Sequence, residues 1–230
     1  MLSLEPTNKY KIILIGDTNV GKTNFLHRFS QNIFDENLRK TVGIQLTKKK
    51  LLINNKVIEM NILDTGGDPK SRPITNFYLQ GAIGYFLFYD ITNLLTYNSL
   101  PRYLEEIRQF SDKNSIIMII GTKCDMKNER VIFALDAYEF ARREKLTFFE
   151  TSSKLGINIS EVFSNFLYQV EKCQKLRSTI KVDIPKAFKT KVFDYFFFLK
   201  EKIQRKSDQI QTSISVPDAV DDDADFENPA

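Results

Sequence analysis

Hydrophobic residues along the chain gather in short continuous runs, and between these runs they recur every three or four positions. A short apolar run bounded by polar or turn residues is typical of a strand buried on both faces, and the longer spacing is typical of a helix that buries one face. The runs predict strands at residues 9–15, 45–53, 57–63, 85–89, 116–120 and 146–149. The helical spacing predicts helices at residues 22–29, 97–110 and 135–143 and a last helix after Asn158.

The order of these elements predicts how the strands pair. Strands that alternate with helices form a parallel sheet covered by helices on both faces. The strands at 45–53 and 57–63, in contrast, are joined only by Asn54-Asn55, a pair that tolerates positive φ and favours an antiparallel hairpin. Asn158 followed by Glu161 resembles a capping box, which would start the last helix there. We expect an α/β domain with a six-stranded, mostly parallel sheet and one antiparallel strand.

Charge is distributed unevenly, although the chain of 230 residues has a net charge of only +4. That total is too small to indicate a nucleic-acid partner. Residues 1–180 carry 25 Lys or Arg and 19 Asp or Glu, residues 181–206 carry eight and three, and residues 207–230 carry none and seven. We therefore expect a folded domain over residues 1–178, a basic helical extension over 179–206 and an acidic, disordered tail over 207–230.

Cysteine content and hydrophobicity exclude several classes of protein. Cys124, Cys173 and a lone His27 are too few for a disulfide framework or for a zinc site built from His and Cys, and they suit a reducing compartment. The first eight residues contain no apolar signal segment, and no apolar run is longer than the five residues 85–89. We expect a cytoplasmic protein that is neither secreted nor integral to a membrane.

The first glycine-bounded loop carries a phosphate-binding pattern. Gly16-Asp-Thr-Asn-Val-Gly21-Lys22-Thr23 fits GxxxxGK followed by Ser or Thr, and it lies between a predicted strand and a predicted helix, which is the context that the motif requires. Its glycines let backbone N–H groups and the helix N-terminus point at phosphate oxygens. Lys22 would reach the β and γ phosphates, and the Thr23 hydroxyl would ligate Mg²⁺. The alternative is an ordinary helix-capping turn.

A second element follows the strand at 57–63. Asp64 stands where that strand ends, so its carboxylate would supply a water-mediated Mg²⁺ contact, and Gly67 would let a backbone N–H approach the γ phosphate closely. Taken alone, Asp-Thr-Gly-Gly is only a strand-to-turn signal. Its position after the phosphate loop favours the functional interpretation.

These motifs, in this order, resemble those of the Ras superfamily of small GTPases, and most of all its Rab branch, over about residues 8–175. Thr122-Lys123-Cys124-Asp125 is similar to the family's guanine-specificity element, N/T-K-x-D. By this resemblance, Asp125 would accept hydrogen bonds from the base, and the stem of Lys123 would lie on the ring face. Residues 150–154, Glu-Thr-Ser-Ser-Lys, resemble the Rab ETSAK loop, which contacts the guanine carbonyl through its backbone.

The resemblance implies the P-loop NTPase fold of a G domain, with GTP or GDP and Mg²⁺ as ligands. Phe34 would pack against the purine, and Thr41 would ligate Mg²⁺ only in the triphosphate state, so that its loop is released after hydrolysis. The implied nucleotide contacts are Asn19, Val20, Gly21, Lys22, Thr23, Asn24, Phe34, Thr41, Gly67, Thr122, Lys123, Asp125, Ser152, Ser153 and Lys154. The implied metal ligands are Thr23, Thr41 and Asp64. The implied catalytic residues are Lys22, Thr41, Gly67 and Asp68.

The segment after Asp64 departs from the family pattern. Where family members usually read DTAGQE, this chain reads Asp-Thr-Gly-Gly-Asp-Pro, so Asp68 replaces the glutamine that positions the attacking water. An aspartate is shorter and normally ionised, and Pro69 and Pro73 stiffen the segment. We expect GTP hydrolysis below the ~10⁻⁴ s⁻¹ scale of an unassisted switch.

Three functions are compatible with these residues. The first is a Rab-type switch that hydrolyses GTP slowly in vesicle traffic or signalling, and the second is a GTP-binding scaffold that hardly hydrolyses. A P-loop kinase of small metabolites is disfavoured, because the sequence has no Arg-rich lid and favours guanine. Effector, exchange-factor and GTPase-activating partners are implied without being identified. The surface aromatics of the Rab branch would fall at Leu46, Leu63 and Tyr78, where only the last is aromatic.

The C-terminal part bears on membrane contact. Rab proteins normally end in prenylated cysteines, whereas the last cysteine here is Cys173, so we expect no prenyl anchor. Residues 186–206 instead place aromatic and aliphatic side chains at helical spacing among Lys and Arg, a pattern that suits an anionic membrane surface. Packing on the domain, binding in a partner's groove and disorder are the alternatives. The hypothesis is peripheral contact with an intracellular membrane.

Overall fold

The structure, a computed structural model, describes residues 5–53, 56–68 and 78–177. All of them lie within a single unit, Met1–Asp183. The expected hairpin turn, the two prolines after Asp68, the expected domain boundary, the basic extension and the acidic tail lie outside the described residues.

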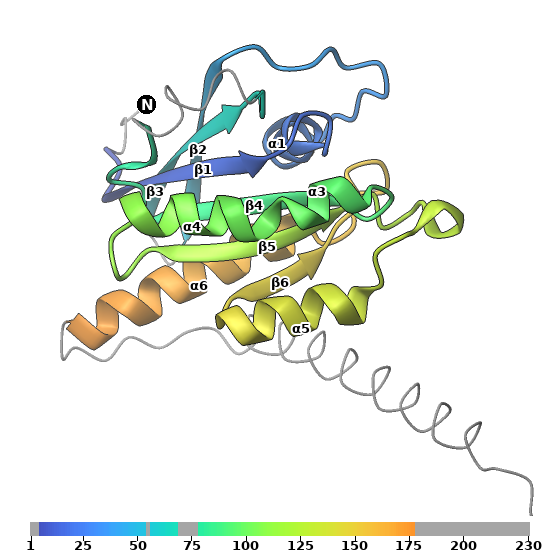
Figure 1. Ribbon diagram of the computed structural model, residues 1–230. Helices are drawn as coiled ribbons and strands as arrows, with labels where there is room; N and C mark the ends of the chain where they lie inside the picture. Colours follow the sequence, from blue (N-terminus) through green and yellow to red (C-terminus); the bar gives the residue numbers. More distant parts are fainter. Residues whose placement is uncertain (1–4, 54–55, 69–77, 178–230) are drawn as a thin grey trace, which may run out of the picture. The chain divides into compact units, whose positions relative to one another are not determined.

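A six-stranded sheet forms the centre of this unit (Figure 1). Its strands are β1 (Asn8–Gly16), β2 (Ile44–Ile53), β3 (Lys56–Thr65), β4 (Gly84–Asp90), β5 (Ile116–Thr122) and β6 (Thr147–Glu150). They are arranged in the order β2-β3-β1-β4-β5-β6, and only β2 and β3 pair antiparallel. The expected fold class and the antiparallel pair are confirmed. Every strand begins and ends within two residues of its expected position, because buried apolar runs define both limits.

The helices differ from the expectation in the segment after β4. They are α1 (Lys22–Gln31), α3 (Leu94–Asn98), α4 (Leu100–Phe110), α5 (Ala134–Glu144) and α6 (Ile159–Arg177), with a 3₁₀ helix at Lys127–Glu129. The single helix predicted over 97–110 was wrong, since α3 and α4 are separate. Asn93 caps α3 by accepting a hydrogen bond from the N–H of Leu95 (3.0 Å). Pro101, which has no N–H, lies in the first turn of α4, where none is needed.

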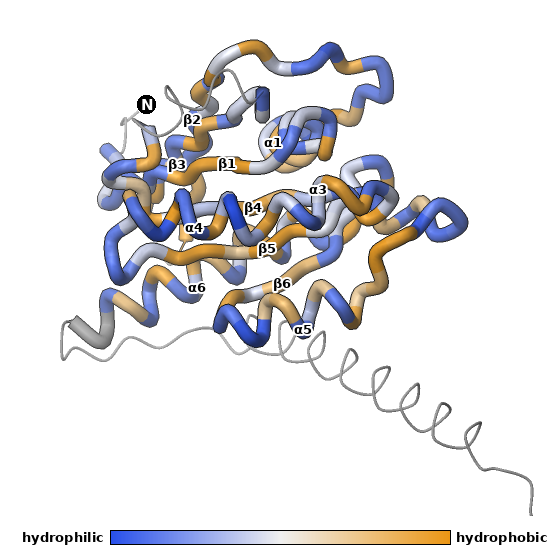
Figure 2. The backbone as a smooth tube through the Cα atoms, viewed as in Figure 1, coloured by the Kyte–Doolittle hydropathy of each residue, from blue (hydrophilic) through white to orange (hydrophobic). Residues whose placement is uncertain are grey.

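Helices cover both faces of the sheet, because successive side chains of a strand point to opposite sides. On one face, the β4 residues Phe86 and Phe88 pack on α6 and α1, with ring centroids 5.3 Å from Phe163 and 5.1 Å from Phe25, respectively. On the other face, the alternate residues of β4, such as Tyr85, join a core cluster with α4 and α5. Figure 2 shows the hydrophobic strands between helices that each carry hydrophilic residues as well.

The start of α6 differs from the expected capping box. An N-cap residue has an extended backbone, and its side chain accepts hydrogen bonds from the first N–H groups of the helix. Asn158 instead has a left-handed backbone (φ 58°), and its side-chain amide donates to the carbonyl oxygen of Glu150 (2.7 Å). It therefore connects the end of β6 to the start of α6.

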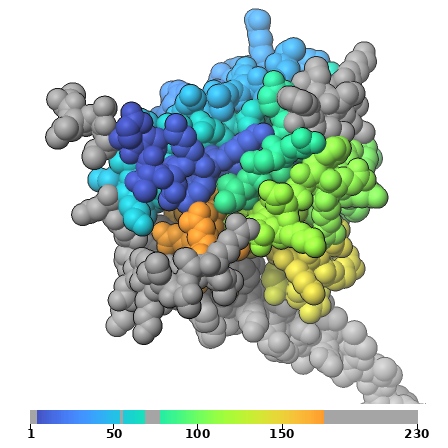
Figure 3. Space-filling model, turned by 90° about the vertical axis from the view of Figure 1, so that its left-hand side faces the viewer, coloured from blue at the N-terminus to red at the C-terminus, as the bar shows by residue number. Residues whose placement is uncertain are grey.

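Figure 3 views the end of the unit at which β1 begins, where α6, in orange, lies near β1, in blue. There the side-chain amide of Gln174 donates to the hydroxyl of Tyr10 (3.3 Å). The carboxyl ends of the parallel strands, where α/β domains bind ligands, lie at the opposite end. None of the helices in the described ranges is both long and apolar enough to cross a membrane.

Candidate functional site

A cleft of about 830 Å³ opens at the carboxyl ends of the parallel strands. The predicted contact residues that line it are Asn19, Gly21, Lys22, Thr23, Asn24, Phe34, Thr41, Thr122, Lys123, Asp125, Ser153 and Lys154. Among the predicted residues, Val20, Asp64, Gly67, Asp68 and Ser152 do not line it. Residues from four separate loops are thus brought to one cavity, as a nucleotide site requires.

The phosphate loop turns from β1 into α1 through left-handed backbone at Asn19 (φ 65°) and Gly21 (φ 96°). Lys22, the first residue of α1, is 4% exposed, and its Nζ donates to the carbonyl oxygens of Gly16 (2.8 Å) and Asp17 (2.7 Å). Burial lowers the pKa of Lys22 to about 8, although nearby carboxylates oppose this shift. A buried ammonium at the N-terminus of a helix suits a phosphate group.

Three side chains meet beside the phosphate loop at the metal corner, which we define as Thr23, Thr41 and Asp64. The hydroxyl of Thr23 lies 2.7 Å from that of Thr41 and donates to Asp64 Oδ2 (2.6 Å). Burial raises the pKa of Asp64, and the hydrogen bond from Thr23 opposes this shift. Asp64 Oδ1 is buried and has no hydrogen-bond partner within the described part of the chain. Two hydroxyls and an unpaired carboxylate oxygen fit a hard divalent cation such as Mg²⁺.

Two glycines bring the loop after β3 against the rest of the site. The N–H of Gly66 donates to the carbonyl oxygen of Gly43 (3.0 Å), and a Cβ at Gly66 would lie 2.3 Å from the carbonyl oxygen of Thr41. A Cβ at Gly67, whose φ is 73°, would lie 2.5 Å from the carbonyl oxygen of Gly16. Side chains larger than hydrogen do not fit such approaches. The segment around Thr41, the loop after β3 and the phosphate loop are therefore in direct contact.

Gly67 and Asp68 face a different space from the other predicted residues. Together with Tyr103 they line a cavity of about 20 Å³ beside α4. The hydroxyl of Tyr103 donates to Asp17 Oδ1 (2.8 Å), which connects α4 to the phosphate loop. The catalytic roles expected for Gly67 and Asp68 stay predictions.

Thr122, which also lines the cleft, joins three elements. Its hydroxyl contacts the carbonyl oxygens of Val20 (2.6 Å) and Tyr89 (3.0 Å), which connects β5 to the phosphate loop and to β4. Val20 is fully buried, so its side chain packs under the phosphate loop and does not line the cleft. Lys123 follows with a left-handed backbone (φ 60°), and its Nζ pairs with Asp90 Oδ2 (2.5 Å). Thr122, in the position of the family's Asn, therefore joins β5 to the segments around it. We call the part of the cleft lined by Thr122, Lys123 and Asp125 the base end, after the role that the resemblance implies for it.

The loop after β6 is held against α1 by one arginine. Arg28 Nε donates to the carbonyl oxygen of Ser153 (2.7 Å), and its Nη2 donates to that of Lys154 (3.1 Å). Ser152 is fully buried, and its hydroxyl accepts a hydrogen bond from the N–H of Leu155 (3.0 Å). Ser152 therefore shapes the loop, and Ser153 and Lys154 are the residues that reach the cleft.

Asn24 fixes the rim of the cleft. Its side-chain amide donates to the carbonyl oxygen of Asp35 (2.8 Å), and its Oδ1 accepts from the N–H of the same residue (3.0 Å). This reciprocal pair holds the neighbouring Phe34 at the cleft. An exposed ion pair between Lys154 and Glu36 (3.1 Å) adds a weak contact across the mouth.

Cys124, within residues 122–125, has a thiol of low reactivity, because the thiolate is the reactive form. Burial, together with the carboxylates of Glu150 and Asp125, raises the pKa of the Cys124 thiol to about 11. Cys124 and Cys173 are both free thiols.

The sequence prediction missed other residues of the site. The cleft is also lined by Thr18, Glu36, Leu38, Arg39, Lys40, Thr65, Gly66, Met126, Lys127, Asn128 and Glu129. Most of these residues are neighbours of motif residues in the sequence, so an expectation extended by a few positions around each motif would have included them. Arg28 and Asp90 carry no such signal, because one lies within a helix and the other ends a strand, and only the fold brings them to motif residues.

Comparisons with known proteins agree with this geometry. A model of the Ras family matches residues 11–172. Ras-related protein Rab11A of Lotus japonicus is 40% identical over 161 residues, which cover 70% of this chain and 71% of that protein. Ras-related protein RABA4d of Arabidopsis thaliana is also 40% identical over 161 residues, with 70% and 72% covered. Ras-related protein Rab11B of Nicotiana tabacum is 37% identical over 168 residues, with 72% and 77% covered. The chain therefore belongs to the Ras family of small GTPases and, within it, to the Rab branch.

Proposed function

We propose that this chain is a guanine-nucleotide switch that binds GTP or GDP with Mg²⁺ and hydrolyses GTP slowly. The observation that carries the proposal is that Lys22 and Thr23 of the phosphate loop and helix α1 line the same cleft as Asp125, which follows β5. A guanine nucleotide matches this arrangement, because its phosphates suit the buried ammonium and its base offers the pair of N–H groups that a carboxylate accepts. An adenine base offers no such pair.

The phosphate end has two tasks. Lys22 would exchange the carbonyl oxygens of the phosphate loop for phosphate oxygens, which favour its charged form. Thr23, Thr41 and Asp64 would hold Mg²⁺, which neutralises phosphate charge when bound. The contacts of Thr41 with Thr23 and with Gly66 would transmit the nucleotide state to the surface. We expect two conformations that differ around residues 41–43 and 66–68.

The nucleotide content of the purified protein tests the base. We expect about one guanine nucleotide per chain, as GDP after slow turnover. Adenine nucleotide in its place, or a protein that fails to take up guanine nucleotide when it is supplied in excess, would contradict the proposal.

Slow hydrolysis is the part of the proposal that depends on Asp68. Its carboxylate would bring negative charge near the γ phosphate, and it is one methylene shorter than the family's glutamine, so it orients water poorly. In single-turnover assays we expect a rate below ~10⁻⁴ s⁻¹ for the wild type and about a tenfold increase for Asp68→Gln. Asp68→Ala removes the charge but supplies no group that orients water, so its rate should also stay below ~10⁻⁴ s⁻¹. A wild-type rate at the ordinary family level, unchanged in Asp68→Ala, is the result that excludes this idea.

A GTP-binding scaffold that hardly hydrolyses is the second candidate. The contacts of Gly66 with Thr41 and Gly43 favour it, because they give the two loops a direct contact of their own. Partner binding of equal strength with GDP and with a non-hydrolysable GTP analogue would support the scaffold. A difference of tenfold or more would support the switch.

Rab kinship supports a role in vesicle traffic. Of the three positions where Rab proteins carry surface aromatics, Leu46 and Tyr78 are exposed and Leu63 is buried, so a partner would contact the first two.

We propose that residues 186–206 contact an anionic membrane, because their sequence combines basic and aromatic residues. Sedimentation of the full chain with liposomes tests this, and binding that is indifferent to anionic lipid would remove the membrane contact.

A further inference from the structure

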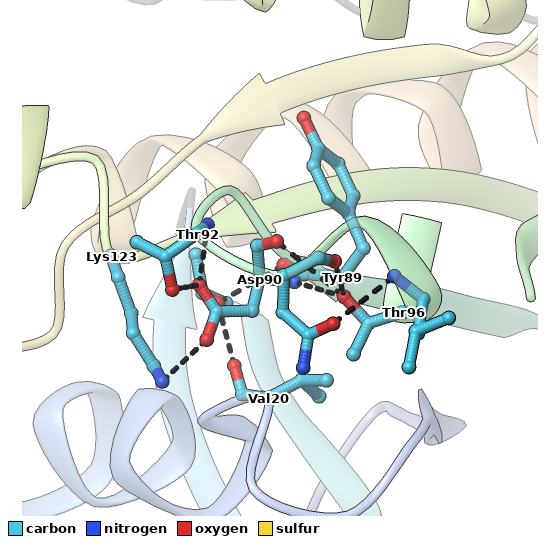
Figure 4. Close-up of polar contacts among 9 residues, drawn as sticks. Val20, Tyr89, Asp90, Thr92, Thr96 and Lys123 are labelled. Carbon is cyan, nitrogen blue, oxygen red and sulfur yellow. Dashed lines mark hydrogen bonds and ion pairs between the residues drawn. The ribbon is translucent and has the colours of Figure 1, made fainter. Parts of the chain in front are cut away.

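Asp90, the last residue of β4, is a buried carboxylate that belongs to no motif. Asp90 is 5% exposed. Its Oδ1 accepts hydrogen bonds from the N–H (2.9 Å) and the hydroxyl (2.8 Å) of Thr92, and its Oδ2 pairs with Lys123 Nζ (2.5 Å), as Figure 4 shows. Both oxygens therefore have partners. The turn made with Thr92 fixes the direction in which the carboxylate points toward the lysine.

Lys123 is consequently held at both of its ends. Its backbone has a φ of 60°, which residues other than glycine rarely adopt, and its carbonyl oxygen accepts a hydrogen bond from the N–H of Met126 (2.9 Å). Its ammonium is held by Asp90. The side chain is 37% exposed and lines the cleft, whereas Asp90 does not line it. The four-carbon stem thus spans two fixed points at the base end of the cleft.

We propose that Asp90 is a positioning residue for the guanine base, because it holds the Lys123 ammonium so that the lysine stem forms a fixed apolar platform for the ring. The assignment rests on the proposed function, since it requires a base beside Lys123. The Lys123 ammonium is paired with the carboxylate of Asp90. The stem of Lys123 is therefore placed to contact the ring face of the base, and its charge is not placed to contact a phosphate.

This role predicts a particular pattern of ligand effects. The stem would touch the ring face, which GDP, GTP and inosine diphosphate share. Contacts of Asp125 with the base edge and of Lys22 with the phosphates are separate from the platform. Loss of the platform should therefore weaken all three nucleotides by the same factor.

Asp90→Asn is the direct test, because asparagine keeps the size of the side chain and one oxygen for Thr92 while it removes the charge that faces Lys123. We expect fluorescently labelled GDP, GTP and inosine diphosphate to dissociate about tenfold faster from this variant, with equal factors for the three. Glu139→Gln is the matched control, since it removes the exposed ion pair of Glu139 with Arg142 (2.6 Å) on α5. Its dissociation rates should equal those of the wild type.

Lys123→Met separates positioning from a purely structural role. Methionine keeps an apolar stem without the charge, so we expect about fivefold faster release from this variant alone. Asp90→Asn should add nothing in the Lys123→Met background. The role of Asp90 would be overturned if Asp90→Asn raised the dissociation rate by the same factor in the wild type and in Lys123→Met. A dissociation rate that is unchanged in either single variant would also overturn it. A wild-type protein that binds no guanine nucleotide would overturn the proposed function itself, and this assignment with it.

Discussion

The two ends of the cleft are built in different ways. At the base end, Thr122 and Asp90 are the last residues of β5 and β4, and their side chains are bonded to neighbouring loops and to Lys123. At the metal corner, which we expect to lie at the γ-phosphate end, Thr41 lies between α1 and β2. Gly66 lies in the loop after β3, and the two meet through close backbone approach. Under the proposed function, recognition of the base would depend on residues at the ends of strands, whereas the nucleotide state would be read by loops. The loop after β3 is also where Gly66 and Asp68 depart from the family pattern.

The largest effect should follow from a change at the base end. Asp125→Asn replaces a group that accepts two hydrogen bonds by one that accepts and donates, so one guanine N–H loses its partner. We expect the affinity for GDP to fall by about a hundredfold or more, measured by titration with fluorescent GDP. Asp112→Asn, at an exposed position in the loop before β5, should leave the affinity unchanged. Equal affinities of Asp125→Asn and wild type would mean that the base is not read at this end.

A smaller loss of nucleotide affinity should follow when Asp125 is kept but the hydrogen bonds of the Thr122 hydroxyl are removed. Thr122→Val keeps the shape of the side chain and removes the hydroxyl that contacts Val20 and Tyr89. We expect the free energy of unfolding to fall by about 1 to 3 kcal/mol, because a buried carbonyl loses its partner, and GDP to dissociate about tenfold faster. Thr122→Ser keeps the hydroxyl and should resemble the wild type. If the valine and serine variants behave alike in thermal unfolding, the hydroxyl is not the support.

The same contrast explains what the sequence could predict. The strand that ends at Thr122 is fixed by its apolar run, so a short motif after it was sufficient to locate Lys123 and Asp125 at the cleft. Ser152 was expected at the cleft by resemblance, but it is buried in its own loop, because a motif does not say which side of a turn faces the ligand. The contact of Arg28 with a loop 125 residues away arises from packing, and local pattern carries no information about it.

At the γ-phosphate end, restoring a family residue should disturb the metal corner while sparing the base. In Gly66→Ala, a Cβ placed 2.3 Å from the Thr41 carbonyl oxygen must displace one of the two loops. Displacement of Thr41 moves its hydroxyl away from Thr23, so we expect the Mg²⁺ affinity of the GTP complex to fall about fivefold. The affinity for GDP without Mg²⁺ is the internal control and should stay within about twofold. A metal titration curve identical to that of the wild type would show that the contact is dispensable.

The smallest effect should come from the arginine that reaches the guanine loop. Arg28→Lys keeps the charge but loses the fork that serves Ser153 and Lys154 together. We expect only about twofold faster GDP release, because backbone hydrogen bonds such as Thr151 N–H to the carbonyl oxygen of Gly121 (2.7 Å) still hold this loop to β5. Stopped-flow dissociation measures the change. A tenfold increase in the rate of GDP release would mean that Arg28, and not the backbone hydrogen bonds to β5, holds the loop after β6 in place.

The two free thiols give the molecule a natural point of attachment. The thiolate is the form that attacks an alkylating reagent, and the pKa of about 11 keeps Cys124 protonated at neutral pH. Cys173 lies on α6 next to Gln174 in the sequence. The contact of Gln174 with Tyr10, near the start of β1, places this part of α6 at the end of the unit opposite the cleft. A maleimide dye or a derivatised sensor chip should therefore couple at Cys173 in the unmodified chain. Molecules immobilised in this way would present the nucleotide cleft to the solution in a uniform orientation.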